Sequence, residues 1–269
     1  MIVNNFEHVE VCMGTTFRFA GCTDLGAQEF AGAIHGACAE LHEADEIFST
    51  YKQNSPISRL ARGETNLASC PPVVADIWDA CDEWQSKTNG WFNAMTPQNT
   101  FDPSGLVKTW AAQNAANVLL AAGITDFTMN AGGDVFIADG VSQDIDWRIG
   151  ISKTVSIASP EAGVLTVIDL KDTKFRALAT SGSAERGDHI WNPKAPNKEV
   201  AKELLQVSVV ARDLVTADVW ATAAFAEGAR AVDHLEKIEG IEALFVLANG
   251  ELAATSGFAR LFAKHGLSH

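Results

Sequence analysis

The stretch Ala-Asp-Val-Trp-Ala-Thr at residues 217–222 lies within an alanine-rich segment, Asp213 to Gly228, that predicts a helix ended by a glycine. Asp218 and Thr222 are four positions apart, so a helix places both side chains on one face, about one turn apart. A carboxylate and a hydroxyl in this arrangement present two hard oxygen donors, which Mg²⁺ prefers. The structural alternative is that Asp218 lies in the first turn, where the helix dipole favours it, and that Thr222 bonds to a carbonyl of its own helix.

The overall composition is that of a globular protein, with 269 residues of which 47% are hydrophobic and 20% charged. This length allows one large domain or two modest ones. The 34 acidic residues outnumber the 20 basic residues, giving a net charge of −14. Such a surface repels a phosphate backbone, so we expect no nucleic-acid partner. An anionic ligand would need local amides, a lysine or a metal ion.

The cysteines are five in number, at Cys12, Cys22, Cys38, Cys70 and Cys81, without a C-x-x-C pair. This pattern predicts free thiols rather than a disulfide framework or a zinc site. The first ten residues contain no basic residue before an apolar run, so we expect no signal peptide. We also expect no membrane span, because no apolar run approaches about 18 residues. The sequence therefore predicts a cytoplasmic protein, unless an export signal has been lost.

The distribution of periodicities predicts an α+β protein. Apolar residues recur every three or four positions over Ala27–Phe48, Val73–Asn89 and Ser104–Gly123, which predicts amphipathic helices. The middle of the chain alternates and is punctuated by glycines, which predicts short, mostly antiparallel strands. We expect one unit over residues 1–269, with two lobes, a mixed or antiparallel sheet, flanking helices and a central ligand cleft. The predicted strands are Val9–Phe19 with a bend or bulge at Gly14, Phe127–Met129, Val135–Ala138, Trp147–Ile151, Val164–Leu170, Phe175–Ala179, Gln206–Ala211 and Ala243–Ala248, and a further helix is predicted over Ala231–Ile238. A short helix is also predicted to begin at Ser55-Pro56, with an N-cap followed by proline, and to end at Gly63.

Several polar clusters interrupt these elements, and each has an ordinary structural explanation. Met13 could be a core residue, and Tyr51 a half-buried tyrosine. Lys108 could be a solvated helix lysine, and His189 a structural histidine. Other polar residues could serve as turns and caps: Asp102, Ser104 and the turn at Gly132-Gly133.

Taken together and in order, the clusters resemble the ApbE-type flavin transferases, the FAD:protein FMN transferases. A single string of this kind is degenerate, but nine in the order of the family, from about Val11 to Gly250, are specific. The strings are MGTTF at Met13, FSTY at Phe48, NSPISRL at Asn54, NGWFN at Asn89, DPSGLVK at Asp102, NAGGD at Asn130, ATSG at Ala179, HIWNP at His189 and ADVWAT at Ala217.

The resemblance implies a single flavin transferase domain with an activity and two partners. FAD would bind in an extended cleft with Mg²⁺ at its pyrophosphate. The FMN half would be transferred to a threonine hydroxyl of an acceptor flavoprotein domain, and AMP would be released. Splitting a pyrophosphate calls for a metal ion that absorbs developing charge, and the attacking hydroxyl calls for a base.

The resemblance also implies residue roles. His189 matches the position of a suspected base, and Asp218 is assigned to catalysis with it. The implied metal site comprises the main-chain carbonyl of Gly105, the side chains of Asp218 and Thr222, and Ala221 beside them. The implied contacts to FAD are Met13, Tyr51, Trp91, Phe92, Asn93, Asp102, Lys108 and Ile190.

The sequence departs from the family pattern at several positions. Thr109 stands where glycine is usual, and we expect it to crowd the ligand or shift the start of its helix. Asn93 stands where aspartate is common, and Ala195-Pro196 replaces a threonine-glycine pair. These departures keep two alternatives open: an enzyme that hydrolyses FAD to FMN and AMP, and a non-catalytic FAD-binding protein.

Overall fold

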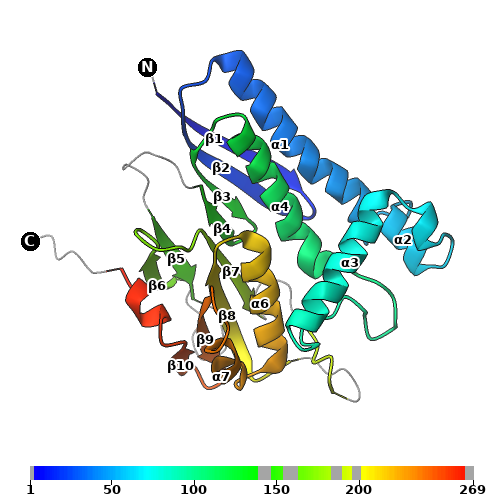
Figure 1. Cartoon of the computed structure of the whole chain (residues 1–269), viewed down its shortest axis with the longest axis vertical. Coiled ribbons are helices and arrows are strands. Elements are labelled where there is room, and N and C mark those ends of the chain that lie inside the picture. The colour runs from blue at the N-terminus through cyan, green and yellow to red at the C-terminus, as the bar shows by residue number, and fades with distance from the viewer. Residues whose placement is uncertain (1–2, 139–146, 154–162, 183–189, 196–200, 264–269) are drawn as a thin grey trace, which may run out of the picture.

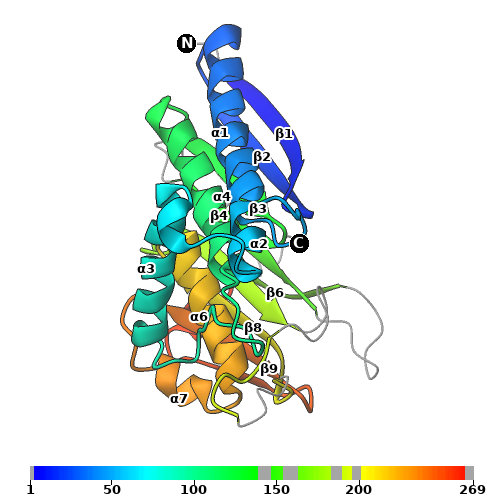
Figure 2. The same ribbon diagram turned by 90° about the vertical axis from the view of Figure 1, so that its right-hand side faces the viewer.

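The computed structural model describes residues 3–138, 147–153, 163–182, 190–195 and 201–263 (Figure 1). Within these residues an eight-stranded antiparallel sheet has helices on one face and a two-stranded sheet on the other (Figure 2). The α+β class, the antiparallel sheet and the flanking helices are thus confirmed. The strand order is β1-β2-β3-β4-β7-β8-β9-β10, with β5-β6 as the separate pair.

The elements follow the predicted alternation of helical and extended segments. One hairpin, β1 (Asn4–Cys12) and β2 (Thr15–Thr23), precedes the long helix α1 (Ala27–Phe48). The remaining elements are α2 (Pro56–Ala61), η1 (Leu67–Ser69), α3 (Pro72–Lys87), α4 (Ser104–Ala121), β3 (Asp126–Ala131), β4 (Asp134–Ile137), β5 (Arg148–Ser152), β6 (Val164–Asp169), β7 (Ala177–Gly182), β8 (Leu204–Ala211), α6 (Leu214–Glu227), α7 (Ala231–Leu235), β9 (Glu242–Leu247), β10 (Leu252–Ala254) and η2 (Phe258–Leu261).

The first hairpin turns at Met13 and Gly14. Both residues have positive φ, 52° and 70°, as the two central positions of a type I′ turn require. Two strands therefore form, rather than one strand with a bulge. Along β1 the apolar side chains face outward, which reverses the usual alternation of a half-buried strand. Val9 and Val11 are 51% and 69% exposed, while Cys12 is buried.

Helix α6 has the predicted boundaries because both of its ends are capped. Asp213 accepts a hydrogen bond from the Thr216 amide at 2.8 Å, and Gly228 follows the last turn with φ of 85°. Asp218 therefore lies in the second turn, so the alternative that placed it in the first turn is wrong. Helix α6 packs on β7, β8 and α4.

Small side chains allow the helices to approach the sheet and each other closely. Ala177 and Ala179 of β7 face the helices, whereas Leu178 between them belongs to a second core shared with β5 and β6. The facing helices bury alanines too, and they bring the polar residues of α4 and α6 into contact. These alanines are Ala111, Ala112, Ala115 and Ala116 of α4 and Ala217, Ala221, Ala223, Ala224 and Ala226 of α6.

A few predicted boundaries were wrong. Helix α3 ends at Lys87 rather than Asn89, and α7 ends at Leu235 rather than Ile238. Strand β7 runs from Ala177 to Gly182, later than predicted, and β10 and η2 were not predicted. Among the helices of the described ranges, none is both long and apolar enough to span a bilayer.

Candidate active site

The carboxylate of Asp218 is buried and is held by helix α4. Its side chain is 8% exposed. The hydroxyl of Thr109 donates a hydrogen bond to Asp218 Oδ2 at 3.0 Å, and Lys108 Nζ lies 3.9 Å from the same oxygen. Two consecutive residues of α4 thus orient one carboxylate of α6.

Lys108 forms a second, closer ion pair with Asp134. The two side chains are 16% and 2% exposed, and Lys108 Nζ lies 2.5 Å from Asp134 Oδ2. The other oxygen of Asp134 accepts a hydrogen bond from the Thr180 amide at 3.0 Å. The alternative of a solvated Lys108 is therefore wrong. The Lys108 ammonium thus lies within reach of two carboxylates, those of Asp134 and Asp218.

Hydroxyl groups complete the polar side of this region. Ser181 Oγ of β7 lies 3.3 Å from Thr222 Oγ1 of α6. Gly105 lies in the first turn of α4, one turn before Thr109 and on the same face. Ala221 is fully buried and offers only its main-chain carbonyl. The side-chain donors that the structure brings together here are oxygens, including one buried carboxylate, and such donors fit Mg²⁺ better than a softer metal ion.

The aromatic segment before α4 is largely buried. Phe92 is in the core, and its ring would contact a Cβ at Gly105 at 3.4 Å, so it packs against the start of α4. Trp91 is buried too, and Lys194 Nζ lies 4.1 Å from its ring centroid. Trp91 also lines a cavity of about 450 Å³ with Asn89, Lys194, Glu227, Arg230, Asp233, His234 and Lys237.

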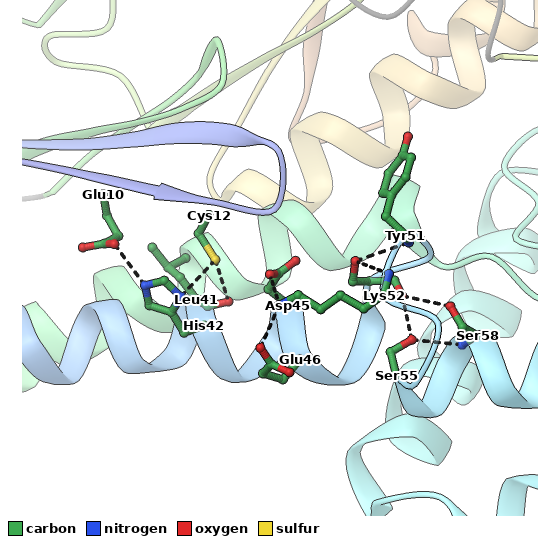
Figure 3. A network of polar contacts seen from close by, with 11 residues as sticks. Glu10, Cys12, Leu41, His42, Asp45, Glu46, Tyr51, Lys52, Ser55 and Ser58 are labelled. Carbon is green, nitrogen blue, oxygen red and sulfur yellow. Dashed lines mark hydrogen bonds and ion pairs between the residues drawn. The ribbon is translucent and has the colours of Figure 1, made fainter.

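Tyr51 differs from the sequence-based alternative, because it is 95% exposed rather than half-buried. It projects from the loop between α1 and α2, while its amide bonds to Ser49 Oγ at 3.3 Å (Figure 3). At this exposure the ring is available to a ligand.

Met13 is partly buried at the tip of the first hairpin, where it packs against the main core. The amide of Gly132 donates a hydrogen bond to the carbonyl of Thr16 at 3.0 Å. The Met13-Gly14 turn therefore lies beside the Gly132-Gly133 turn, which leads directly into Asp134. The hairpin tip and the Lys108–Asp134 pair are thus at the same end of the sheet.

Asp102 and Asn93 organise the loop before α4. Asp102 Oδ1 accepts a hydrogen bond from the Ser104 amide at 3.0 Å, and Asn93 Oδ1 accepts one from the Met95 amide at 2.7 Å. Asp102 is therefore a turn residue, but the predicted cap by Ser104 is wrong, because its side chain caps nothing. A cavity of about 260 Å³ adjoins Asp102, lined also by Thr50, Ile57, Ser58, Ala61, Arg62, Thr96, Thr100 and Phe101.

The segment around the predicted base is only partly described. His189 lies outside the described residues. Ile190 is buried, and its carbonyl accepts a hydrogen bond from the Ala201 amide at 3.1 Å. Asn192 Oδ1 accepts from the amides of Lys194 and Ala195 at 2.9 and 3.1 Å, which closes a turn up to Ala195. The neighbouring Pro196 lies outside the described ranges.

The family profile of ApbE matches residues 13–98 and 95–245, which is most of the chain. The chain belongs to the ApbE family. It is 23% identical over 163 residues to the FAD:protein FMN transferase of Salmonella typhimurium, covering 58% of this chain and 45% of that protein. It is 25% identical over 169 residues to that of Klebsiella pneumoniae, covering 60% and 49%. The chain thus aligns with about half the length of these curated ApbE relatives.

Solved ApbE structures share the fold. The ApbE protein of Thermotoga maritima superposes with a TM-score of 0.80 at 20% identity, covering 97% of this chain and all of that one. The flavin transferase ApbE of Vibrio cholerae superposes with a TM-score of 0.78 at 17% identity, with the same coverage. The agreement of family profile and fold confirms the resemblance inferred from the nine strings.

Three polar residues of this ApbE chain were not assigned to the site from sequence, namely Thr109, Asp134 and Ser181. Asp134 and Ser181 lay in recognised strings, NAGGD and ATSG, next to glycines, which was a usable signal. In the sequence, Thr109 stands out only as a departure from the family pattern. It does not shift its helix, since α4 begins at Ser104, and its side chain is fully buried against α6.

Proposed function

We propose that this protein is an FAD:protein FMN transferase that uses Mg²⁺, and that residues 1–269 act as one flavin transferase domain. The observation that carries the proposal is the convergence of Lys108 and Thr109, both of α4, on the buried carboxylate of Asp218 in α6. The family membership and the names of the relatives support the same activity.

Asp218 and Thr222 would hold the metal ion by their side chains, with the carbonyl of Gly105 and the backbone at Ala221 beside them. When bound, Mg²⁺ would neutralise charge on the pyrophosphate of FAD. Lys108 is already close to Asp218, so its ammonium can contact the same phosphate oxygens. Asp134 also holds this ammonium in place, through the closer of the two ion pairs.

The transfer forms one bond and breaks one. The threonine oxygen of the acceptor domain would attack the phosphorus of the FMN half, while the bond between that phosphorus and the bridging oxygen breaks. AMP leaves with the bridging oxygen, and the threonine becomes a phosphoester. The hydroxyl proton would pass to His189, whose ordinary pKa near 6.5 suits a base at neutral pH.

The flavin contacts are proposed from position and exposure. The exposed ring of Tyr51 can stack on an aromatic ring system, and Met13 can offer an adaptable apolar surface. The remaining proposed contacts to FAD are Trp91, Phe92, Asn93, Asp102 and Ile190.

The test is an incubation of the purified protein with FAD, Mg²⁺ and a small flavin-binding domain that carries a threonine near a Ser/Thr-Gly pair. Intact mass should show the acceptor gaining one FMN, with release of AMP, and a chelator should prevent both. An Asp218→Asn variant is the matched negative control.

Two other outcomes would overturn the proposal. Release of FMN and AMP with an unmodified acceptor would identify a pyrophosphatase. Intact FAD bound without turnover at saturating Mg²⁺ would identify a binding protein. The buried, well-packed position of Thr109 removes one argument for the latter, since this residue leaves the start of α4 unchanged.

A further inference from the structure

The inner face of the edge strand β1 carries polar residues where a core-facing strand normally carries apolar ones. His8, Glu10 and Cys12 alternate toward α1, whereas Val9 and Val11 point to solvent. Departures of this kind from binary patterning are expected at functional or strained sites.

Helix α1 presents matching residues to this face. Cys38 and His42 are four positions apart, so they lie on one side of the helix. Cys38 Sγ is 3.3 Å from His8 Nε2, and His8 Nε2 is 3.3 Å from Glu10 Oε2. The nitrogen, oxygen and sulfur atoms all lie within 4.8 Å of one another.

A second layer of contacts holds Glu10. His42 Nε2 lies 3.0 Å from Glu10 Oε1, and His42 Nδ1 lies 3.6 Å from Cys12 Sγ (Figure 3). Cys12 in turn donates to the carbonyl of Leu41 at 3.4 Å. Glu10 is therefore held through one oxygen by His42, while its other oxygen faces His8. Metal-binding carboxylates are commonly oriented by such an outer partner.

Two of the three separations between these atoms suit a tetrahedral metal ion. With Zn–N and Zn–O distances near 2.0 Å and a Zn–S distance near 2.3 Å, neighbouring ligand atoms lie about 3.3–3.6 Å apart. The separations of His8 Nε2 from Cys38 Sγ and from Glu10 Oε2, 3.3 Å each, are close to these values. A mixed set of imidazole, thiolate and carboxylate favours zinc-class ions over Mg²⁺.

We propose that His8, Glu10 and Cys38 bind one divalent cation of the zinc class, with His42 as the residue that orients Glu10. Cys38 is buried while the side chains of His8 and Glu10 are 33% and 24% exposed, so the cluster can be reached from solvent. Binding would release the thiol proton of Cys38 to solvent and would link the edge strand β1 to α1. The site is separate from the residues assigned to flavin transfer and does not depend on that function.

The first experiment titrates Co²⁺ into the full chain after chelator treatment and reduction of the thiols. Excess Mg²⁺ is present to occupy hard oxygen sites. We expect one equivalent of Co²⁺ to produce a thiolate-to-cobalt charge-transfer band in the near ultraviolet, and Zn²⁺ to abolish this band by displacement. Absence of the band in the wild-type protein would overturn the proposal without reference to any variant.

Two variants and a matched control locate the site. Cys38→Ser should lose the band and weaken Zn²⁺ binding, measured by chelator competition, by more than about tenfold, and His8→Gln should weaken binding similarly. Cys70→Ser removes a thiol near α3, and should keep both the band and the affinity. An undiminished band in folded Cys38→Ser, as judged by circular dichroism, would contradict the assignment.

The effect of Zn²⁺ on thermal stability gives an independent measure of binding at this site. Zn²⁺ should raise the melting temperature of the wild-type protein, because the ion binds the folded chain across β1 and α1. The rise should be clearly smaller in His8→Gln than in the wild type, and unchanged in Cys70→Ser. An equal rise in all three proteins would place the binding elsewhere and reject the site.

Discussion

Thr109 Oγ1 and Asp218 Oδ2 are 3.0 Å apart in the buried interface between α4 and α6. The same hydroxyl lies 3.3 Å from the carbonyl of Leu106 in its own helix. A hydroxyl carries one proton, so the two acceptors compete for it. The charged carboxylate is the stronger acceptor, and the hydrogen bond therefore restrains the rotamer of the proposed metal ligand.

Substitutions at Thr109 should separate the hydroxyl from the shape of the side chain. Thr109→Val keeps the shape but leaves Asp218 without this donor, which should lower the free energy of unfolding by about 1–3 kcal/mol. It should also weaken Mg²⁺ binding measured by calorimetry. Thr109→Ser keeps the donor and should have the smaller effect on both quantities. Equal Mg²⁺ affinities in the two variants would show that the hydrogen bond does not position Asp218.

The pair Asp218 and Thr222 should account for the dependence on Mg²⁺. Asp218→Asn removes the charge that attracts the ion. Thr222→Val removes the hydroxyl donor and keeps nearly the same side-chain shape. We expect the first to abolish Mg²⁺ binding and the second to weaken it, as measured by calorimetry without FAD. Asp76→Asn, a change on the exposed face of α3, is the matched control and should bind Mg²⁺ like the wild type. Unchanged binding in Asp218→Asn would exclude Asp218 as a ligand.

Replacing one member of the Lys108–Asp134 ion pair should destabilise the protein more than half as much as replacing both. Each of Lys108→Met and Asp134→Asn leaves a buried charge without its main partner, at a cost of about 3–5 kcal/mol in the free energy of unfolding. The double variant removes both charges and should be less destabilised than the sum of the two singles. Urea denaturation of the four proteins measures the coupling, and simple additivity would argue against a direct interaction.

Sequence predicted the elements whose limits are set by neighbouring residues. Ser55 accepts a hydrogen bond from the Ser58 amide, with Pro56 in the first turn, so the start of α2 could be located without the fold. Asp213 and Gly228 set the limits of α6 in the same way. The order of the nine strings identified the family. Among them, DPSGLVK lies at the start of α4, ATSG in β7 and ADVWAT within α6, the elements that carry the proposed site.

The contacts within the site could not be predicted, because they join residues far apart in the chain. Lys108 and Asp134 are 26 positions apart, and Thr109 and Asp218 are 109 apart. No local pattern encodes such pairs. The cysteine spacing likewise indicated no metal site, since Cys38 meets His8 only when β1 packs against α1. Strand β10 needs β9 as its partner for the same reason.

Cys81 of α3 should make the protein less stable at alkaline pH. Burial, and next the negative charge of Asp82, raise the pKa of this thiol from 9.0 to about 12. Between these values the unfolded chain has lost the thiol proton that the folded chain retains. The unfolded state then binds fewer protons, so the free energy of unfolding falls as pH rises, by at most about 1.4 kcal/mol per pH unit.

Replacing Cys81 should remove this component of the pH dependence. Cys81→Ala and Cys81→Ser are expected to be less stable than the wild type near neutral pH, because they alter a buried position. Above the ordinary pKa of the thiol, their deficits should shrink steadily, since neither variant titrates there. Urea denaturation at a series of pH values up to about 10 measures the difference. The two variants differ in shape and polarity but not in ionisation, so their deficits should shrink in parallel. A deficit that stays constant with pH would show that Cys81 titrates alike in the folded and unfolded chains.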